Sequence, residues 1–175
     1  MPIFGGSKRP KLDGLTRDEE KRRDALNPEV LRRSGEKGVA GQAPAAAALL
    51  REKLEAEPKE YLWPLLLGWQ MMSLKRFAPA IEAFVETVQR SDQEVRGHYG
   101  AGIAYFEAAE AKLQHGPATT EDLAPESMTV DNLYHEALRH FRRGLELTDD
   151  NGEREQLRTA ATTVEKAIAR KAGRL

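Results

Sequence analysis

The sequence predicts an all-α protein, and three observations point to that class. Alanine is abundant while aromatic residues make up 6% of the chain, a composition that suits close-packed helices better than a β-sandwich. Apolar residues recur at helical spacing in several segments. Two of these segments share one order of small and aromatic residues, as the two copies of a duplicated helix-turn-helix unit would. We therefore expect helices and almost no sheet.

The duplicated unit is defined by two constant offsets. The offset is 34 in the first helix of each copy, for Gly68 and Gly102 and for Met71 and Tyr105. It is 57 in the second helix, for Phe77 and Tyr134, Ala80 and Ala137, and Phe84 and Phe141. The second copy therefore carries 57 − 34 = 23 extra residues between its helices. We expect this insertion at about residues 107–130, as an extension of the first helix followed by an exposed, acidic loop over residues 116–129.

The N-terminal quarter of the chain shows little helical periodicity. Residues 1–15 are rich in Gly, Pro and Lys, and we expect them to be disordered. Thr16 and Glu19 have the spacing of a capping box, which predicts a short charged helix. We interpret residues 35–42 as a flexible linker. The predicted organisation is a mostly disordered, mildly basic tail with short helices over residues 1–43, and one helical domain over residues 44–175.

The helical domain begins with an incomplete unit and ends with a cap. Residues 44–57 favour a helix that Pro58 stops, and stepping back 34 residues from Ala80 reaches Ala46, the place of a second helix in a preceding unit. Further helices are predicted over residues 62–73, 75–90, 92–115, 131–147 and 153–172. The last helix has a single apolar stripe, which suits a solvent-facing cap; the stripe consists of Leu157, Ala161, Val164 and Ile168.

This pattern resembles the tetratricopeptide (TPR) repeat, whose 34-residue period carries a small residue and an aromatic on the first helix, then an Ala and an aromatic on the second. The resemblance implies two antiparallel helix-turn-helix repeats, a flanking half-repeat and a C-terminal capping helix over about residues 44–172. In such a stack the first helices of successive repeats line a concave groove. The resemblance places eight partner-binding residues there: Leu62, Leu65, Trp69, Met72, Arg96, Tyr99, Ile103 and Phe106.

The residues of this groove indicate what it would bind. Family members that hold an acidic peptide carboxylate use Lys and Asn at such places, where this chain has Leu65, Trp69 and Ile103. An apolar, aromatic groove favours an apolar peptide or an amphipathic helix. The expected function is a non-catalytic adaptor or scaffold with a protein or peptide partner. The alternative is a structural subunit of a homo- or hetero-oligomer, in which the groove is occupied by the chain's own Leu12, Leu15, Val30 or Leu31.

No motif in the sequence predicts catalysis, a metal site or a cofactor. The chain has no cysteine, so disulfides and thiolate chemistry are excluded. His135 and His140 are five residues apart, whereas the helical zinc motif needs a spacing of four, and we expect both on the surface of a charged helix. The glycine-rich residues 97–102 reverse the dinucleotide-binding order and follow no strand, so we interpret them as helix-packing residues.

Charge distribution provides a weaker alternative. Residues 1–44 hold ten Lys/Arg and seven Asp/Glu, a net charge of +3. Two of the three basic clusters of this region are interleaved with acids, and no aromatic residues accompany them, which disfavours nucleic-acid or membrane tethering through the tail. The apolar residues 61–72 fall short of the ~20 residues that span a bilayer. The start of the chain contains no long apolar stretch typical of a signal peptide, and we expect a cytoplasmic protein.

Overall fold

The computed structural model describes residues 12, 14–35, 38–116 and 119–173. The described residues form eight α-helices and no strand, which confirms the predicted all-α class. The helices are α1 (Arg17–Asp24), α2 (Asn27–Ser34), α3 (Gly38–Ala56), α4 (Leu62–Ser73), α5 (Phe77–Arg90), α6 (Val95–His115), α7 (Val130–Leu147) and α8 (Asn151–Ala172).

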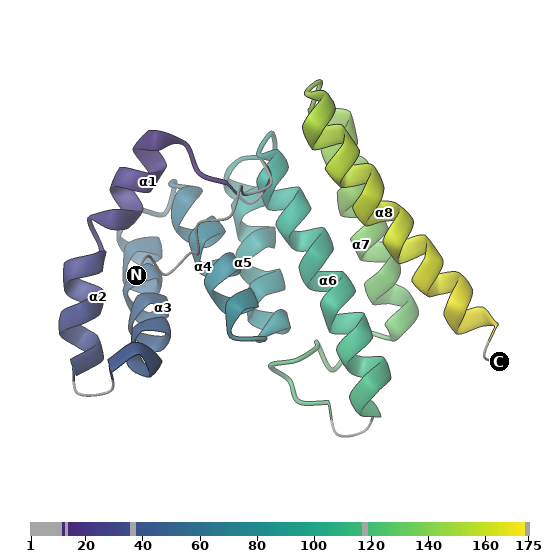
Figure 1. Ribbon diagram of the computed structural model, residues 1–175, viewed down its shortest axis with the longest axis horizontal. Coiled ribbons are helices and arrows are strands. Elements are labelled where there is room, and N and C mark those ends of the chain that lie inside the picture. The colour runs from purple at the N-terminus through teal and green to yellow at the C-terminus, as the bar shows by residue number, and fades with distance from the viewer. Residues whose placement is uncertain (1–11, 13, 36–37, 117–118, 174–175) are drawn as a thin grey trace.

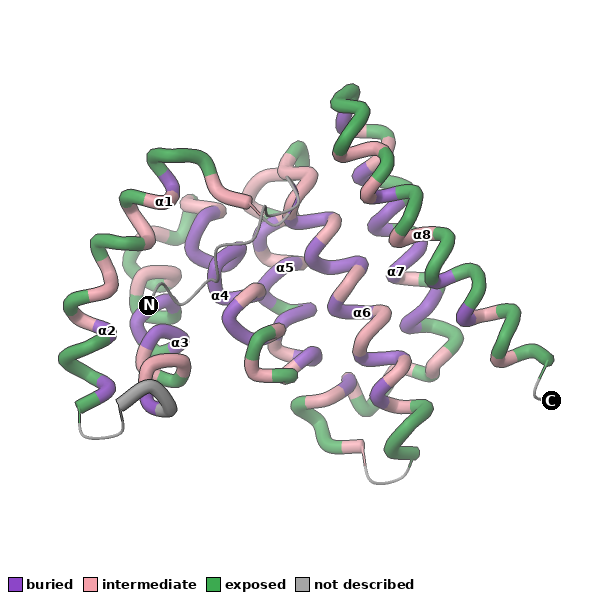
Figure 2. The backbone as a smooth tube through the Cα atoms, viewed as in Figure 1, coloured by how far each residue is buried: buried purple, intermediate pink, exposed green. Residues whose placement is uncertain are grey.

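Helices that are neighbours in sequence are also neighbours in space. From α2 to α8 each helix packs against the next, and α6 also contacts both α4 and α8. Figure 1 shows the succession from α2 and α3 at the left to α7 and α8 at the right, with consecutive helices running in opposite directions. The buried residues concentrate on α4, α5 and α6, whereas much of α8 is exposed (Figure 2). A bilayer-spanning segment is not found among the described helices, none of which combines sufficient length with sufficient apolar character.

The two offsets of the sequence correspond to one repeated contact in the core. A Cβ atom at Gly68 of α4 would lie 2.6 Å from Cε1 of Phe84 on α5, and a Cβ atom at Gly102 of α6 would lie 2.7 Å from Cδ1 of Phe141 on α7. Both rings are completely buried. Each glycine therefore leaves room for an aromatic ring from the following helix. Gly100 of α6 meets Phe84 from the other side, so this ring is held between two helices.

Several helices begin at a capping residue whose side chain accepts a hydrogen bond from a backbone N–H group. Thr16 and Glu19 form both hydrogen bonds of the predicted capping box at α1. Thr129 and Asp150 cap α7 and α8 by accepting hydrogen bonds from backbone N–H groups of the first turn. At α6 the cap is Glu94, which accepts from the Arg96 N–H, so the helix starts at Val95 and not at residue 92 as predicted.

The described part of the N-terminal region belongs to the packed structure. Leu12 is completely buried in the main core, and Leu15 packs against that core. Val30 of α2 packs on Ala46 and Leu49 of α3. The predicted boundary at residue 44 falls inside the continuous helix α3, and most of the predicted linker over residues 35–42 is its first turn. The disorder predicted for residues 1–11 lies outside the described residues.

The insertion of the second copy is held to the helical body by hydrogen bonds and by packing. Helix α6 extends to His115, as the predicted helix extension requires. The loop that follows is anchored by the Lys112 ammonium, which donates to the carbonyl oxygens of Pro125, Glu126 and Met128. Ala124 of the same loop is buried. The loop is therefore packed against the helical body at its second half, and its acidic residues Glu121 and Glu126 remain exposed as predicted.

Candidate binding groove between α6 and α8

A cavity of about 440 Å³ lies between α6 and α8, above a residue of α7. Helix α6 contacts α8 far less than it contacts α7, so side chains do not close the space between these two helices. The apolar residues of the lining are Tyr99, Ile103, Phe106, Phe141, Ala160 and Val164. The polar residues are Glu107, Glu155, Gln156, Thr159 and Thr163, together with Gly152. We call this cavity the α6–α8 groove.

Three of the eight predicted partner-binding residues line the α6–α8 groove. Tyr99, Ile103 and Phe106 follow one another along one side of α6, at helical spacing, and all three are only partly buried. Their remaining exposure results from the distance between α6 and α8. These three residues keep accessible apolar area, and their role in binding a partner stays a prediction.

Two further predicted residues extend this apolar surface onto α4. Trp69 and Met72 are partly buried and pack against the core. The Trp69 ring lies 4.9 Å from the Phe84 ring and 6.3 Å from the Tyr99 ring, measured between centroids. The rings of Tyr99 and Phe141 are 6.1 Å apart. A chain of aromatic contacts therefore connects α4 with the floor of the α6–α8 groove.

Leu62 and Leu65 are a correction to the sequence prediction, because neither reaches the surface. Both side chains are completely buried in the main core. Helix α4 packs against α3, α5 and α6, so the face that a shorter stack would leave open is covered here. These two leucines stabilise the fold and have no exposed area with which to contact a partner.

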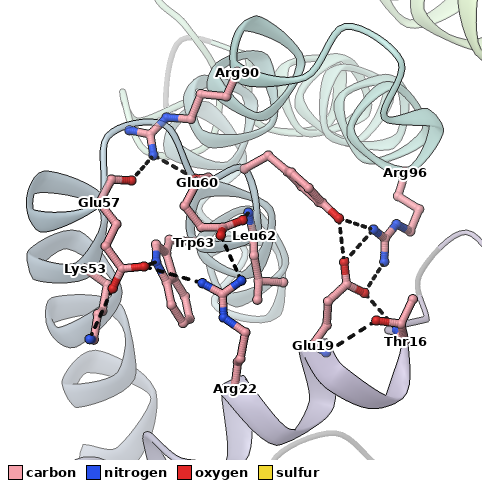
Figure 3. A network of polar contacts seen from close by, with 11 residues as sticks. Thr16, Glu19, Arg22, Lys53, Glu57, Glu60, Leu62, Trp63, Arg90 and Arg96 are labelled. Atoms are coloured by element: carbon pink, nitrogen blue, oxygen red, sulfur yellow. Dashed lines mark hydrogen bonds and ion pairs between the residues drawn. The ribbon is translucent and has the colours of Figure 1, made fainter.

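Arg96 is the second correction, because its guanidinium is already occupied within the chain (Figure 3). It donates to both carboxylate oxygens of Glu19 on α1, at 2.7 and 2.8 Å, and to Glu94 at 2.7 Å. It also donates to the carbonyl oxygen of Gly14. Burial alone would raise the pKa of Glu19, but hydrogen bonds from Arg96, the Thr16 backbone and Tyr61 outweigh it and lower the pKa to about 2. Arg96 holds α1 against the start of α6.

Several basic residues of α1 and α2 are also paired within the chain. Arg22 contacts Glu60 at 2.8 Å, and its guanidinium lies over the Trp63 ring at 4.7 Å from the centroid. Arg32 and Arg33 both pair with Glu29. These contacts leave the described basic clusters with little free positive surface for a nucleic acid. The cluster at residues 8–11 lies outside the described residues.

The apolar tail residues considered as possible occupants of the groove lie elsewhere. Leu12 and Leu15 belong to the main core, and Val30 packs on α3. Leu31 is 57% exposed. None of the described residues between 12 and 35 lines the α6–α8 groove.

The α8 wall of the groove was not predicted. The sequence identified the stripe through Leu157 and Val164, and both are buried as a cap requires. The neighbouring side of α8 carries Gln156, Thr159 and Thr163, which line the groove. These uncharged polar residues interrupt an otherwise highly charged helix, and this interruption is the signal that sequence reasoning could have used.

The histidine prediction holds for His135 and is wrong for His140. His135 is exposed, but His140 is buried, and its Nδ1 lies 3.0 Å from Nδ1 of His98 on α6. Burial, the neighbouring His98 and the positive charge of Arg139 lower the pKa of His140 to about 3. The two rings therefore stay neutral and share one proton in a hydrogen bond. His140 faces inward because its side of α7 packs against α6, where His98 lies.

Comparison with known proteins assigns the chain to no family. The chain matches no protein-family model, and a search of curated proteins finds no relative with significant similarity.

Proposed function

We propose that this protein is a non-catalytic interaction module with a TPR-like arrangement, and that it binds an apolar or amphipathic helical segment of a partner protein in the α6–α8 groove. The TPR-like arrangement is supported by the offsets of 34 and 57 residues and by the repeated contact that they produce. Gly68 faces Phe84 as Gly102 faces Phe141. The order of helices, with α4, α6 and α8 in successive contact, agrees with this arrangement.

One observation carries the proposed binding function: partly buried aromatic and aliphatic side chains line an open space between two helices. Tyr99, Ile103 and Phe106 keep accessible apolar area although they lie beside the fully buried Phe141. Burying such area gives about 25 cal/mol per Å². An apolar partner side chain that enters the groove would therefore bury this area and stabilise the complex.

The extent of the apolar surface favours a peptide over a small molecule. The accessible apolar residues continue from the groove through Tyr99 to Trp69 and Met72 on α4. The accessible apolar residues therefore come from α4, α6 and α8 and extend beyond the single concave pocket that a small molecule would occupy. An amphipathic helix, which presents apolar residues every three or four positions, fits an elongated groove.

Binding can be tested with a matched pair of variants on the same helix. Ile103→Gln makes the groove polar without emptying the core, and Leu113→Gln makes the same change at a residue that is 40% exposed and outside the groove. The probe is a synthetic amphipathic helix with a Leu/Ala face and a neutral Gln/Ser face, followed by fluorescence anisotropy. We expect saturable binding that Ile103→Gln weakens about tenfold and Leu113→Gln leaves unchanged. Absence of saturable binding, or an equal effect of both variants, contradicts the proposal.

A further inference from the structure

We propose that the segment bound in the α6–α8 groove is a basic amphipathic helix of a partner protein, and that one of its Lys or Arg side chains pairs with Glu107. This inference rests on the proposed binding function and adds the charge of the partner. The groove has an apolar floor and carboxylates on both walls, Glu107 on α6 and Glu155 on α8. No Lys or Arg is among its lining residues in the described part of the chain.

Glu107 differs from two neighbouring acidic residues, Glu110 and Asp131, in having no partner within the described chain. Glu110, one turn further along α6, accepts hydrogen bonds from Tyr134 and Arg170. Asp131 of α7 pairs with Lys171 of α8 at 2.8 Å. Glu107 is partly buried, and its carboxylate has no hydrogen bond or ion pair with any described residue. Among the described residues, Glu110 and Asp131 therefore have partners within the chain, whereas the carboxylate of Glu107, which lines the groove, has none.

The surroundings of Glu107 disfavour its negative charge when the groove is empty. Loss of solvent, and next the negative charge of Glu110, raise the pKa of Glu107, and the positive charge of Lys75 opposes this with a smaller effect. A partly desolvated carboxylate without a partner gains more from an approaching cation than a fully hydrated one does. A basic side chain that enters the groove supplies this missing partner.

The second carboxylate limits the class of partner further. Helices α6 and α8 run in the same direction, so Glu155, near the start of α8, and Glu107, in the middle of α6, lie toward opposite ends of the groove (Figure 1). Glu155 likewise forms no hydrogen bond or ion pair through its carboxylate with a described residue. Gln156, Thr159 and Thr163 supply neutral hydrogen-bonding groups along the α8 wall. An acidic peptide would meet repulsion at both ends, whereas a basic amphipathic helix meets attraction.

The test uses three peptides that share a Leu/Ala face and differ only in their polar face, which carries Lys, Gln or Glu. Each is titrated against the full-length protein, the Glu107→Gln variant and the Glu165→Gln variant. Glu165 is an exposed carboxylate of α8 outside the groove, so its variant has the same net charge as Glu107→Gln. We expect the Lys peptide to bind most tightly and the Glu peptide least.

The decisive result is the effect of each variant on the Lys peptide. We expect Glu107→Gln to weaken this peptide about tenfold and to leave the Gln peptide unchanged, while Glu165→Gln changes neither. Equal binding of the Lys and Gln peptides, or equal effects of the two variants, overturns the basic-partner inference while the binding function stands. If even the neutral Gln peptide fails to bind, the proposed function itself is contradicted.

Discussion

Replacing Gly102 by alanine tests whether the close approach of α6 to Phe141 organises the fold. The new Cβ would lie 2.7 Å from Cδ1 and Cζ of the completely buried Phe141 ring. Ordinary contacts between carbon atoms are about 3.5–4.0 Å, so the ring or the helix must move. Overpacking of this kind costs about 1–3 kcal/mol, and the better helix propensity of alanine returns about 1 kcal/mol. We expect Gly102→Ala to lose up to about 2 kcal/mol of unfolding free energy.

The assay is urea unfolding followed by far-UV circular dichroism, with Gly173→Ala as the control. A Cβ at Gly173 meets its nearest atom at 3.6 Å, an ordinary contact, so this variant should be as stable as the wild type or slightly more stable. Phe141→Leu provides a second check, because a smaller side chain should reduce the cost of Gly102→Ala in a double-mutant cycle. If Gly102→Ala is stabilising, as a solvent-exposed helical glycine would be, the proposed contact is refuted.

Three further predictions concern charged and titratable groups. Glu107→Gln should raise the free energy of unfolding at pH 7, because a carboxyl group whose pKa is raised on folding destabilises the folded protein when it is ionised. This gain should fade as the pH falls toward 4.5, and urea unfolding at several pH values measures it. The free energy of unfolding should also fall below pH 6.5, because His140 in the unfolded chain takes up a proton that the folded protein binds only near pH 3. At pH 5 this difference costs about 2 kcal/mol. His140→Phe should therefore make the free energy of unfolding less dependent on pH. Arg96→Met should cost about 2–3 kcal/mol and expose the segment around α1 to limited proteolysis, because it leaves the buried Glu19 carboxylate without its main partner.

Each of these predictions has a result that would contradict it. Equal stability of Glu107→Gln and Glu165→Gln at pH 7 would show that Glu107 carries no penalty. A His140→Phe variant with the same pH profile as the wild type would assign the loss to other groups. The Glu19 contribution has a different window, because a lowered carboxyl pKa stabilises above pH 4.5 and is lost between 4.5 and about 2. Unchanged proteolysis of Arg96→Met would mean that other contacts, such as Leu12 burial and the Arg22–Glu60 ion pair, hold the N-terminal segment without Arg96.

The helices, their caps and the contacts between consecutive helices could be predicted from the sequence, because each depends on residues close together along the chain. The spacing of Gly68, Phe84, Gly102 and Phe141 reflects a contact between consecutive helices, so it appears as a constant offset. The helix caps are local as well, and Thr16 behaves as its spacing predicts. The accessible side of α6 follows from the same periodicity.

Contacts between segments far apart in the sequence could not be predicted from its pattern. Arg96 pairs with Glu19 across 77 residues, so nothing in the spacing of either residue reveals the other. Leu12 is completely buried in the main core, although its surrounding composition is typical of a tail. The inward orientation of His140 likewise depends on the packing of α7 against α6. Their positions depend on packing between segments that the local sequence pattern does not relate to one another.

The central claim, that the α6–α8 groove binds an amphipathic helix, can be tested most directly by nuclear magnetic resonance. The ¹⁵N-labelled full-length protein is titrated with the Lys-bearing amphipathic peptide, and backbone shift changes are assigned to residues. We expect the largest changes to cluster on the two walls of the groove, at Ile103 and Phe106 of α6 and at Thr159 and Thr163 of α8. Changes that cluster around another surface, or the absence of saturable changes, would contradict the central claim.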